Sequence, residues 1–168
     1  MKKLLLILCA FMIAMPNYAQ KLSKAEKKAA EQKAHDKAAE YIKAKDFIIV
    51  PASYEDGDGI MQSNTNNSNF LLCQMKTMYA QGSIVCGNSY TNQVEATEFL
   101  PKFDKKGNLR LSIVVSGRML RGTYTISMRH NSNMADVIFT PINGKTRKFR
   151  GPVESPKEAS YNKRSNPI

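Results

Sequence analysis

The residue types that most often bind metals are scarce and scattered in this chain. There are two histidines: His35 lies in a charged segment near the N-terminus, and His130 lies among turn-forming residues. Neither has a second histidine at the short spacing typical of a metal site. Carboxylates crowd the glycine-rich segment 55–59, which faintly resembles a calcium loop, but Ile60 and the lack of a Glu in register break that pattern. The sequence therefore predicts no metal site.

Nucleophilic catalysis needs a serine or cysteine beside a base and an oriented carboxylate. The sequence has no Gly-x-Ser-x-Gly elbow and no glycine loop of the kind that cradles phosphates. Ser116, His130 and Asp136 are residues of the right types, but nothing in their spacing brings them together. We therefore predict no cofactor and expect binding rather than catalysis.

The best candidate for a binding surface is a basic segment near the C-terminus. Four cations surround Phe149 there: Lys145, Arg147, Lys148 and Arg150. Alternation along a strand would place Arg147 on the face of Phe149, and Lys148 with Arg150 on the other face. We expect this segment to be a sheet edge that contacts an anion. The alternative is a charged edge strand that only blocks sheet-to-sheet aggregation.

Cys73 and Cys86 are the two cysteines outside residues 1–19, the predicted export signal. In an oxidising compartment they are able to form a disulfide, which would stabilise the fold by roughly 3 kcal/mol in the chain-entropy model. The alternative is two buried free thiols that pack as small hydrophobes. A hairpin joining them would be centred near Tyr79-Ala80, which are poor turn residues, so both arrangements stay open.

Residues 1–19 are typical of an export signal. Lys2 and Lys3 precede an apolar stretch, residues 4–15, that is too short to span a bilayer. Ala19 is a suitable residue before a cleavage site. The alternative is an uncleaved N-terminal anchor. We expect an exported protein, periplasmic or secreted, with no transmembrane segment in the mature chain.

The chain is strongly basic. It has 25 Lys and Arg against 14 Asp and Glu, a formal net charge of +11, and loss of Lys2 and Lys3 leaves 23 against 14, or +9. Outside the cytoplasm the anionic partners are lipid headgroups, acidic glycans and other envelope surfaces, so nucleic acid is not expected. A basic solvated surface without a specific partner is the simpler interpretation.

At 168 residues the chain is expected to hold one domain with flanking segments. Residues 20–45 are rich in Lys and Ala and predict a charged helix, with Ser23 and Glu26 as a capping box. Its apolar stripe is mostly alanine, so the helix is expected to dock loosely or to stand partly free. Residues 46–153 form the predicted β domain, and residues 154–168 a flexible C-terminal tail.

The predicted β domain contains short strands separated by turns. Apolar and polar residues alternate most clearly over residues 109–116, 123–129 and 135–139. Further strand-like segments are 47–50, 70–73, 77–86, 94–103 and 145–153. Residues 51–69 form a polar surface loop. No helix-length segment separates the strands, so we predict a mostly β fold: an antiparallel meander forming a small sandwich or barrel, preceded by one N-terminal α-helix. Strand order and closure stay open.

Short motifs in a fixed order also carry a family resemblance. They are Phe47 after the Lys/Ala-rich helix, Asn69-Phe70, Lys106-Gly107, Ser116-Gly117, the Tyr124 strand and Phe149-Arg150-Gly151. Over about residues 25–165 this order resembles the domain-of-unknown-function 4251 family of small exported Bacteroidetes proteins. The family usually has a Gly/Asp turn pair near Gln74-Met75, which this chain lacks. The resemblance implies a fold and an exported location, and no activity.

Two hypotheses of different kinds follow. The first is an exported, non-enzymatic binding or structural module of the cell envelope. Its ligand would be a small apolar molecule held between sheets or an anionic envelope component on the basic segment. The second is a hydrolase of envelope or host polymers, which would need a pocket with converging titratable groups. The absence of a catalytic motif favours the first.

Overall fold

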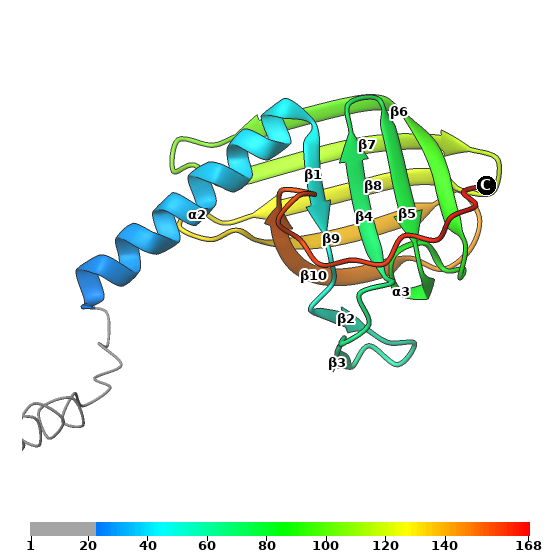
Figure 1. The fold of residues 1–168 in the computed structure, drawn as a ribbon, viewed down its shortest axis with the longest axis horizontal. Helices are drawn as coiled ribbons and strands as arrows, with labels where there is room; N and C mark the ends of the chain where they lie inside the picture. The colour runs from blue at the N-terminus through cyan, green and yellow to red at the C-terminus, as the bar shows by residue number, and fades with distance from the viewer. Residues whose placement is uncertain (1–22) are drawn as a thin grey trace, which may run out of the picture.

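The structure is a computed structural model that describes residues 23–168. The predicted leader and its cleavage site lie outside the described residues. Over residues 23–168, no helix is long and apolar enough to cross a membrane. Antiparallel β-sheet is the main secondary structure of the described chain, with one long helix at its start (Figure 1).

Eight strands close into a barrel. They are β1 (Asp46–Ile49), β4 (Phe70–Gln74), β5 (Thr77–Gln81), β6 (Thr91–Phe103), β7 (Leu109–Gly117), β8 (Arg121–Met128), β9 (Met134–Pro141) and β10 (Arg147–Glu154). Strands β4 to β10 follow one another as an antiparallel meander, and β1 pairs with both β4 and β10. The predicted mostly β meander with an N-terminal helix is confirmed, and the sheet takes the barrel form.

Inward-facing side chains fill the barrel. Buried and exposed positions alternate along β7, β8 and β9, as the sequence pattern predicts. Tyr124 and Phe139 stack inside, with ring centroids 4.3 Å apart. The buried hydroxyl of Tyr124 donates to the Val85 carbonyl at 3.2 Å, so this large ring is fully buried without an orphaned polar atom.

Helix α2 (Lys24–Ala44) begins at the predicted capping box: Ser23 accepts from the Glu26 backbone N–H, and the Glu26 carboxylate accepts from that of Ser23. Only its second half is buried, at His35, Ala38, Ala39 and Ile42, while residues 24–33 are exposed. The first half projects from the barrel in Figure 1. The helix therefore docks by one end and stands free at the other, because its alanine-based stripe buries little area.

Two predicted segments differ in the structure. The loop predicted over 51–69 contains a hairpin, β2 (Ser53–Glu55) and β3 (Met61–Ser63), that extends the sheet beside β10. Its tip turns around Asp56, whose carboxylate accepts from the backbone N–H groups of Asp58 and Ile60. The turn-forming residues that predicted a loop thus connect two very short strands.

The strand predicted over 77–86 ends early. It stops at Gln81, and Gly82, with φ at 94°, turns the chain into the short helix α3 (Ser83–Cys86). A Cβ at Gly82 would collide with the side chain of Asn69, whose amide oxygen accepts from the Ile84 N–H. The hairpin before it turns at Met75, with φ at 60°, and not near Tyr79.

The C-terminal tail is packed, whereas the sequence predicted a flexible segment. It crosses the outside of β4 and β5 (Figure 1). Tyr161 lies edge-on to Phe70 with ring centroids 5.1 Å apart, and the Ile168 backbone exchanges hydrogen bonds with β6. Under it lies a second apolar cluster on the outer face of the barrel: Ile48, Phe70 and Leu72. After a turn closed on the Ser155 carbonyl, the tail runs extended, and Asn162 and Ile168 form their backbone hydrogen bonds with the barrel and its loops.

Removal of residues 159–168 is expected to uncover this outer cluster. We expect a loss of about 2 kcal/mol in the free energy of unfolding, the order for exposing one large apolar side chain, together with increased binding of a hydrophobic dye. Chemical denaturation measures the first and fluorescence the second. Lys157→Ala, an exposed change in the same tail, is the control. A truncated chain with native stability and no added dye binding would contradict this role.

Candidate functional site

The antiparallel meander sends alternate turns to opposite ends of the barrel. The β6–β7 and β8–β9 turns lie at the end where α2 docks, since His35 of α2 contacts Gly107 between β6 and β7. The β7–β8 and β9–β10 turns lie at the other end, together with α3. Polar and charged side chains gather at both ends, and the two groups differ in what they are able to do.

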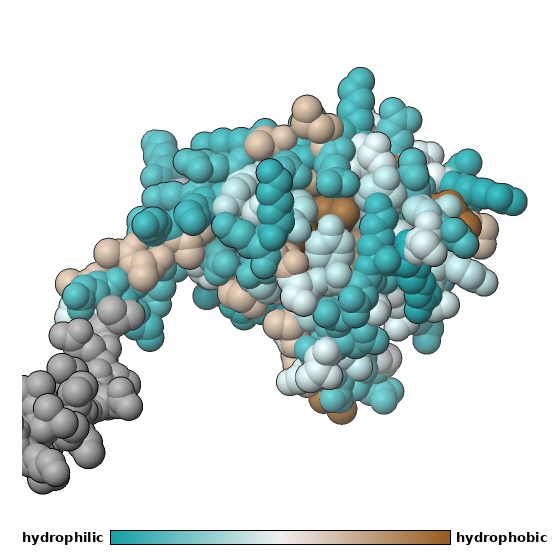
Figure 2. All heavy atoms as spheres, in the orientation of Figure 1, coloured by the Kyte–Doolittle hydropathy of each residue, from teal (hydrophilic) through white to brown (hydrophobic). Residues whose placement is uncertain are grey.

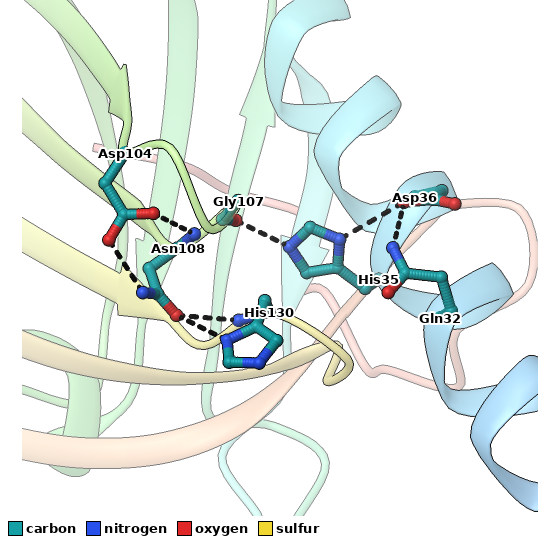
Figure 3. A network of polar contacts seen from close by, with 7 residues as sticks. All are labelled: Gln32, His35, Asp36, Asp104, Gly107, Asn108 and His130. Carbon is teal, nitrogen blue, oxygen red and sulfur yellow. Dashed lines mark hydrogen bonds and ion pairs between the residues drawn. The ribbon is translucent and has the colours of Figure 1, made fainter.

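At the α2 end, a hydrogen-bond network joins two turns (Figure 3). Asp104 accepts from the backbone N–H of Lys106 and of Asn108 at 2.8 and 2.9 Å, and from the Asn108 side-chain amide at 2.7 Å. The Asn108 amide oxygen accepts in turn from the backbone N–H of His130 at 2.9 Å. Hydrogen bonds from Asn108 lower the pKa of Asp104. These hydrogen bonds thus link the β6–β7 turn, residues 104–108, to the β8–β9 turn.

His35 attaches the helix to this network. It is buried, with Nε2 3.0 Å from the Gly107 carbonyl oxygen and Nδ1 3.3 Å from an Asp36 carboxylate oxygen. The Gln32 amide also donates to Asp36, and it lowers the pKa of that carboxyl more than His35 does. A carbonyl oxygen only accepts, so Nε2 carries the hydrogen. The His35 side chain therefore helps to attach α2 to the β6–β7 turn.

The hydrolase hypothesis finds no assembled catalytic group here. Ser116 pairs with Arg121 at the far end of the barrel from His130. Asp136 faces Arg150, with their nearest charged atoms 3.7 Å apart. The structure therefore keeps Ser116 apart from His130, so the serine and the base that acyl transfer needs side by side do not meet.

Asp104→Asn is expected to destabilise the fold in a pH-dependent way. The lowered pKa means that the ionised carboxylate stabilises the folded state above the ordinary Asp pKa, and that this contribution disappears as the pH falls through the lowered value. The variant should be less stable than the native protein at neutral pH and equal to it in strong acid. Denaturation curves over a pH series measure this. Asp58→Asn, whose carboxylate accepts no hydrogen bond from the described residues, is the control. A difference that is constant with pH would contradict the assignment.

The opposite end of the barrel holds a cleft of about 380 Å³. It lies between the β7–β8 turn, the β9–β10 turn and the end of α3. Its lining is Cys86, Gly87, Arg118, Met119, Leu120, Arg121, Phe139, Pro141, Ile142, Asn143, Gly144, Lys145 and Arg147. We call it the basic cleft, because four of these residues are cations and none is an acid.

Arg147 is the most deeply placed cation of the basic cleft. It is half-buried, and its Nε is fully buried without a hydrogen-bond partner among the described residues. Its guanidinium packs on Gly87, where a Cβ would lie 3.2 Å from Nη2. Buried guanidinium nitrogens are normally paired, and carboxylates and phosphates fit them in bidentate geometry. The arrangement suits an anion.

A second, more polar hollow lies on the other side of Arg147, beside Glu55 and Asp56. Both carboxylates are already engaged: Glu55 pairs with Lys148 at 2.8 Å, and Asp56 accepts hydrogen bonds within its own hairpin. Over residues 23–168, Arg147 forms no ion pair with either. Its charge is therefore not neutralised from this side.

The predicted basic segment is divided by its strand. Lys145 and Arg147 line the basic cleft, whereas Lys148 and Arg150 face outward and pair with Glu55 and Asp136. The predicted alternation is therefore observed. The predicted edge is present only at the start of β10, where Arg147 and Lys148 pair with β9 alone. Further along, β10 has a second neighbour: Phe149 and Arg150 pair with β2, and Val153 and Glu154 pair with β1.

Sequence reasoning missed Arg118 and Arg121. They flank the reversal between β7 and β8, next to the turn that begins with Ile142. In a meander, every second turn shares an end, so the strand pattern places the turns 118–120 and 142–146 together. This rule could have predicted from the sequence that Arg118 and Arg121 lie near Lys145 and Arg147.

Cys73 and Cys86 are unbonded in the structure, the second of the two arrangements that the sequence left open. Cys73 lies on β4 and Cys86 on α3, so they are not opposite one another on a hairpin. Burial raises the pKa of Cys73 to about 12 and that of Cys86 to about 11. Both are therefore protonated, poorly nucleophilic thiols, although Cys86 touches the basic cleft.

Two other sequence hypotheses concern ligands. No group of three or more His, Cys, Asp or Glu side chains within residues 23–168 is placed to hold a metal ion. The space between the strands, where an apolar ligand was considered, is occupied by the core side chains. The basic cleft is the place where the structure brings predicted binding residues together.

Comparisons with known proteins bear on the fold. No protein-family model matches the sequence, and no curated protein is detectably similar to it. A solved structure of a DUF4251 family protein from Bacteroides eggerthii is similar, with a TM-score of 0.67 and 20% sequence identity. The match covers 79% of this chain and 94% of that one. This chain therefore has a DUF4251-like fold, as the resemblance in its sequence indicates.

Proposed function

We propose that the protein is an exported, non-enzymatic binding module of the cell envelope that holds an anionic ligand in the basic cleft. The observation that carries this is the buried Nε of Arg147, which has no hydrogen-bond partner among the described residues. It lies in a cleft whose lining, within residues 23–168, has three further cations and no acidic side chain. An orphaned buried guanidinium nitrogen costs stability, and an anion would remove that cost.

Charge elsewhere on the molecule supports an attraction of anions to this end. Without Lys2 and Lys3 of the leader, the formal net charge is +9 (23 Lys and Arg against 14 Asp and Glu). Lys148 and Arg150 on the neighbouring face are offset by carboxylates, while the cleft cations are not. A concave site of one sign raises the local concentration of counter-ions. Binding should therefore weaken as salt increases.

The export signal predicted over residues 1–19 gives the location part of the proposal. In that setting the available anions are phosphate and carboxylate groups of envelope components. A binding role also fits the two thiols, which burial keeps protonated. Edman sequencing of the exported protein would support this location if the first residue is Gln20.

Arg147→Met is expected to weaken anion binding without loss of stability. A charged hydrogen bond is worth about 1.5–3 kcal/mol, so affinity for pyrophosphate at low salt should fall by roughly tenfold or more. The free energy of unfolding should be unchanged or raised by up to about 1–3 kcal/mol, since the orphaned nitrogen is gone. Isothermal titration calorimetry and chemical denaturation measure the two quantities.

Arg150→Met is the matched control, because it removes the same charge from the same strand on the outer face. It should leave pyrophosphate affinity nearly unchanged. Equal losses in the two variants would mean that only net charge matters, and the cleft would then not be the binding site.

A further inference from the structure

Two large apolar side chains stand exposed at the mouth of the basic cleft. Met119 is 58% exposed and Ile142 is 70% exposed. They come from turns that are held together, because the Ile142 backbone N–H donates to the Arg121 carbonyl at 3.0 Å. Leu120, next to Met119, is buried and anchors its turn in the core. The two tips are thus presented by a rigid base.

Cations surround these tips. Arg118 and Arg121 bracket Met119, and Lys145 follows Ile142 by three residues. The two turns, residues 117–121 and 142–147, contain no acidic residue. Apolar tips among cations suit the boundary of a membrane, where apolar side chains enter the acyl layer and cations meet anionic headgroups.

From this arrangement we infer that the basic cleft docks on a membrane containing anionic phospholipids. Arg147 and its neighbouring cations hold a lipid headgroup phosphate, while Met119 and Ile142 enter the apolar layer beside it. The inference rests on the proposed anion-binding function and names its partner. Helix α2, at the opposite end of the barrel, then points away from the membrane.

A second exposed apolar tip, on the β2–β3 hairpin, differs from the basic cleft in its charge. The β2–β3 hairpin exposes Ile60 and Met61 at 59% and 57%, and Figure 2 shows hydrophobic surface at the tip of that hairpin. Its neighbours are the carboxylates Glu55, Asp56 and Asp58. An anionic membrane would repel that tip. Apolar exposure is therefore similar at the two places, and charge favours the basic cleft.

Co-sedimentation with lipid vesicles tests the inference. The protein is recovered after export and mixed with vesicles of phosphatidylcholine alone, or of phosphatidylcholine with phosphatidylglycerol. Binding is expected only to the second kind, and should weaken with salt. Arg118→Gln should reduce it roughly fivefold, the contribution of one cation near a charged surface.

The apolar tips are tested by Met119→Ser combined with Ile142→Ser. Vesicle affinity should fall roughly tenfold or more, because two apolar side chains no longer leave water. Met119→Leu with Ile142→Leu should restore vesicle binding. Ile60→Ser with Met61→Ser, the same kind of change on the acidic hairpin, should leave it native.

Native vesicle binding by the Met119/Ile142 serine variant would overturn the inference, and so would equal binding to phosphatidylcholine alone. In either case, pyrophosphate binding that depends on Arg147 would leave the proposed function standing. Equal pyrophosphate affinity of the native protein and Arg147→Met would contradict the proposed function itself. The two failures are thus distinguished by separate probes.

Discussion

Strand β1 closes the barrel, and the rest of the structure depends on this pairing. Ile48 and Ile49 face Leu72 and Leu71 of β4 on one side and Glu154 and Val153 of β10 on the other. Beyond this short contact the chain bends away, and β2 takes over as the neighbour of β10. Gly151 sits at the crossing, where a Cβ would collide with the Val50 carbonyl. Closure gives every strand of the barrel two neighbours and surrounds one apolar core.

A closed meander gives the molecule two ends with different uses. At one end, the polar side chains pair with one another. Asp104 accepts hydrogen bonds from Asn108, and Asn108 accepts one from the His130 backbone. His35 hydrogen-bonds to the Gly107 carbonyl and so attaches α2 to the barrel. At the other end the charges do not balance, and within residues 23–168 the buried Nε of Arg147 has no hydrogen-bond partner. Burying an unpaired charged group lowers the stability of the fold. A ligand that pairs with Arg147 would therefore stabilise the protein most at this second end.

Closure also creates an outer face that needs covering. Successive side chains of β1 and β4 point to opposite faces of the sheet, so only every second one enters the core. Ile48 of β1 and Phe70 and Leu72 of β4 therefore lie on the outer face. The C-terminal tail covers them, with Tyr161 against Phe70 and the ammonium of Lys163 over the ring of Tyr79. The polar residues from which a flexible tail was predicted face the solvent. A few residues on the opposite side of the tail, such as Tyr161 and Lys163, contact the barrel.

Local pattern was enough to predict the capped helix, the alternating strands β7 to β9, the fold class, and the division of Arg147 from Lys148 and Arg150. These features depend on a repeat of two residues or on contacts a few residues apart, which the sequence displays directly. Barrel closure, the internal place of β10, the docked tail and the meeting of Arg118 and Arg121 with Arg147 were decided by the tertiary structure. Each joins residues far apart in the chain, and such pairings are chosen by packing of the whole core, which no local pattern records.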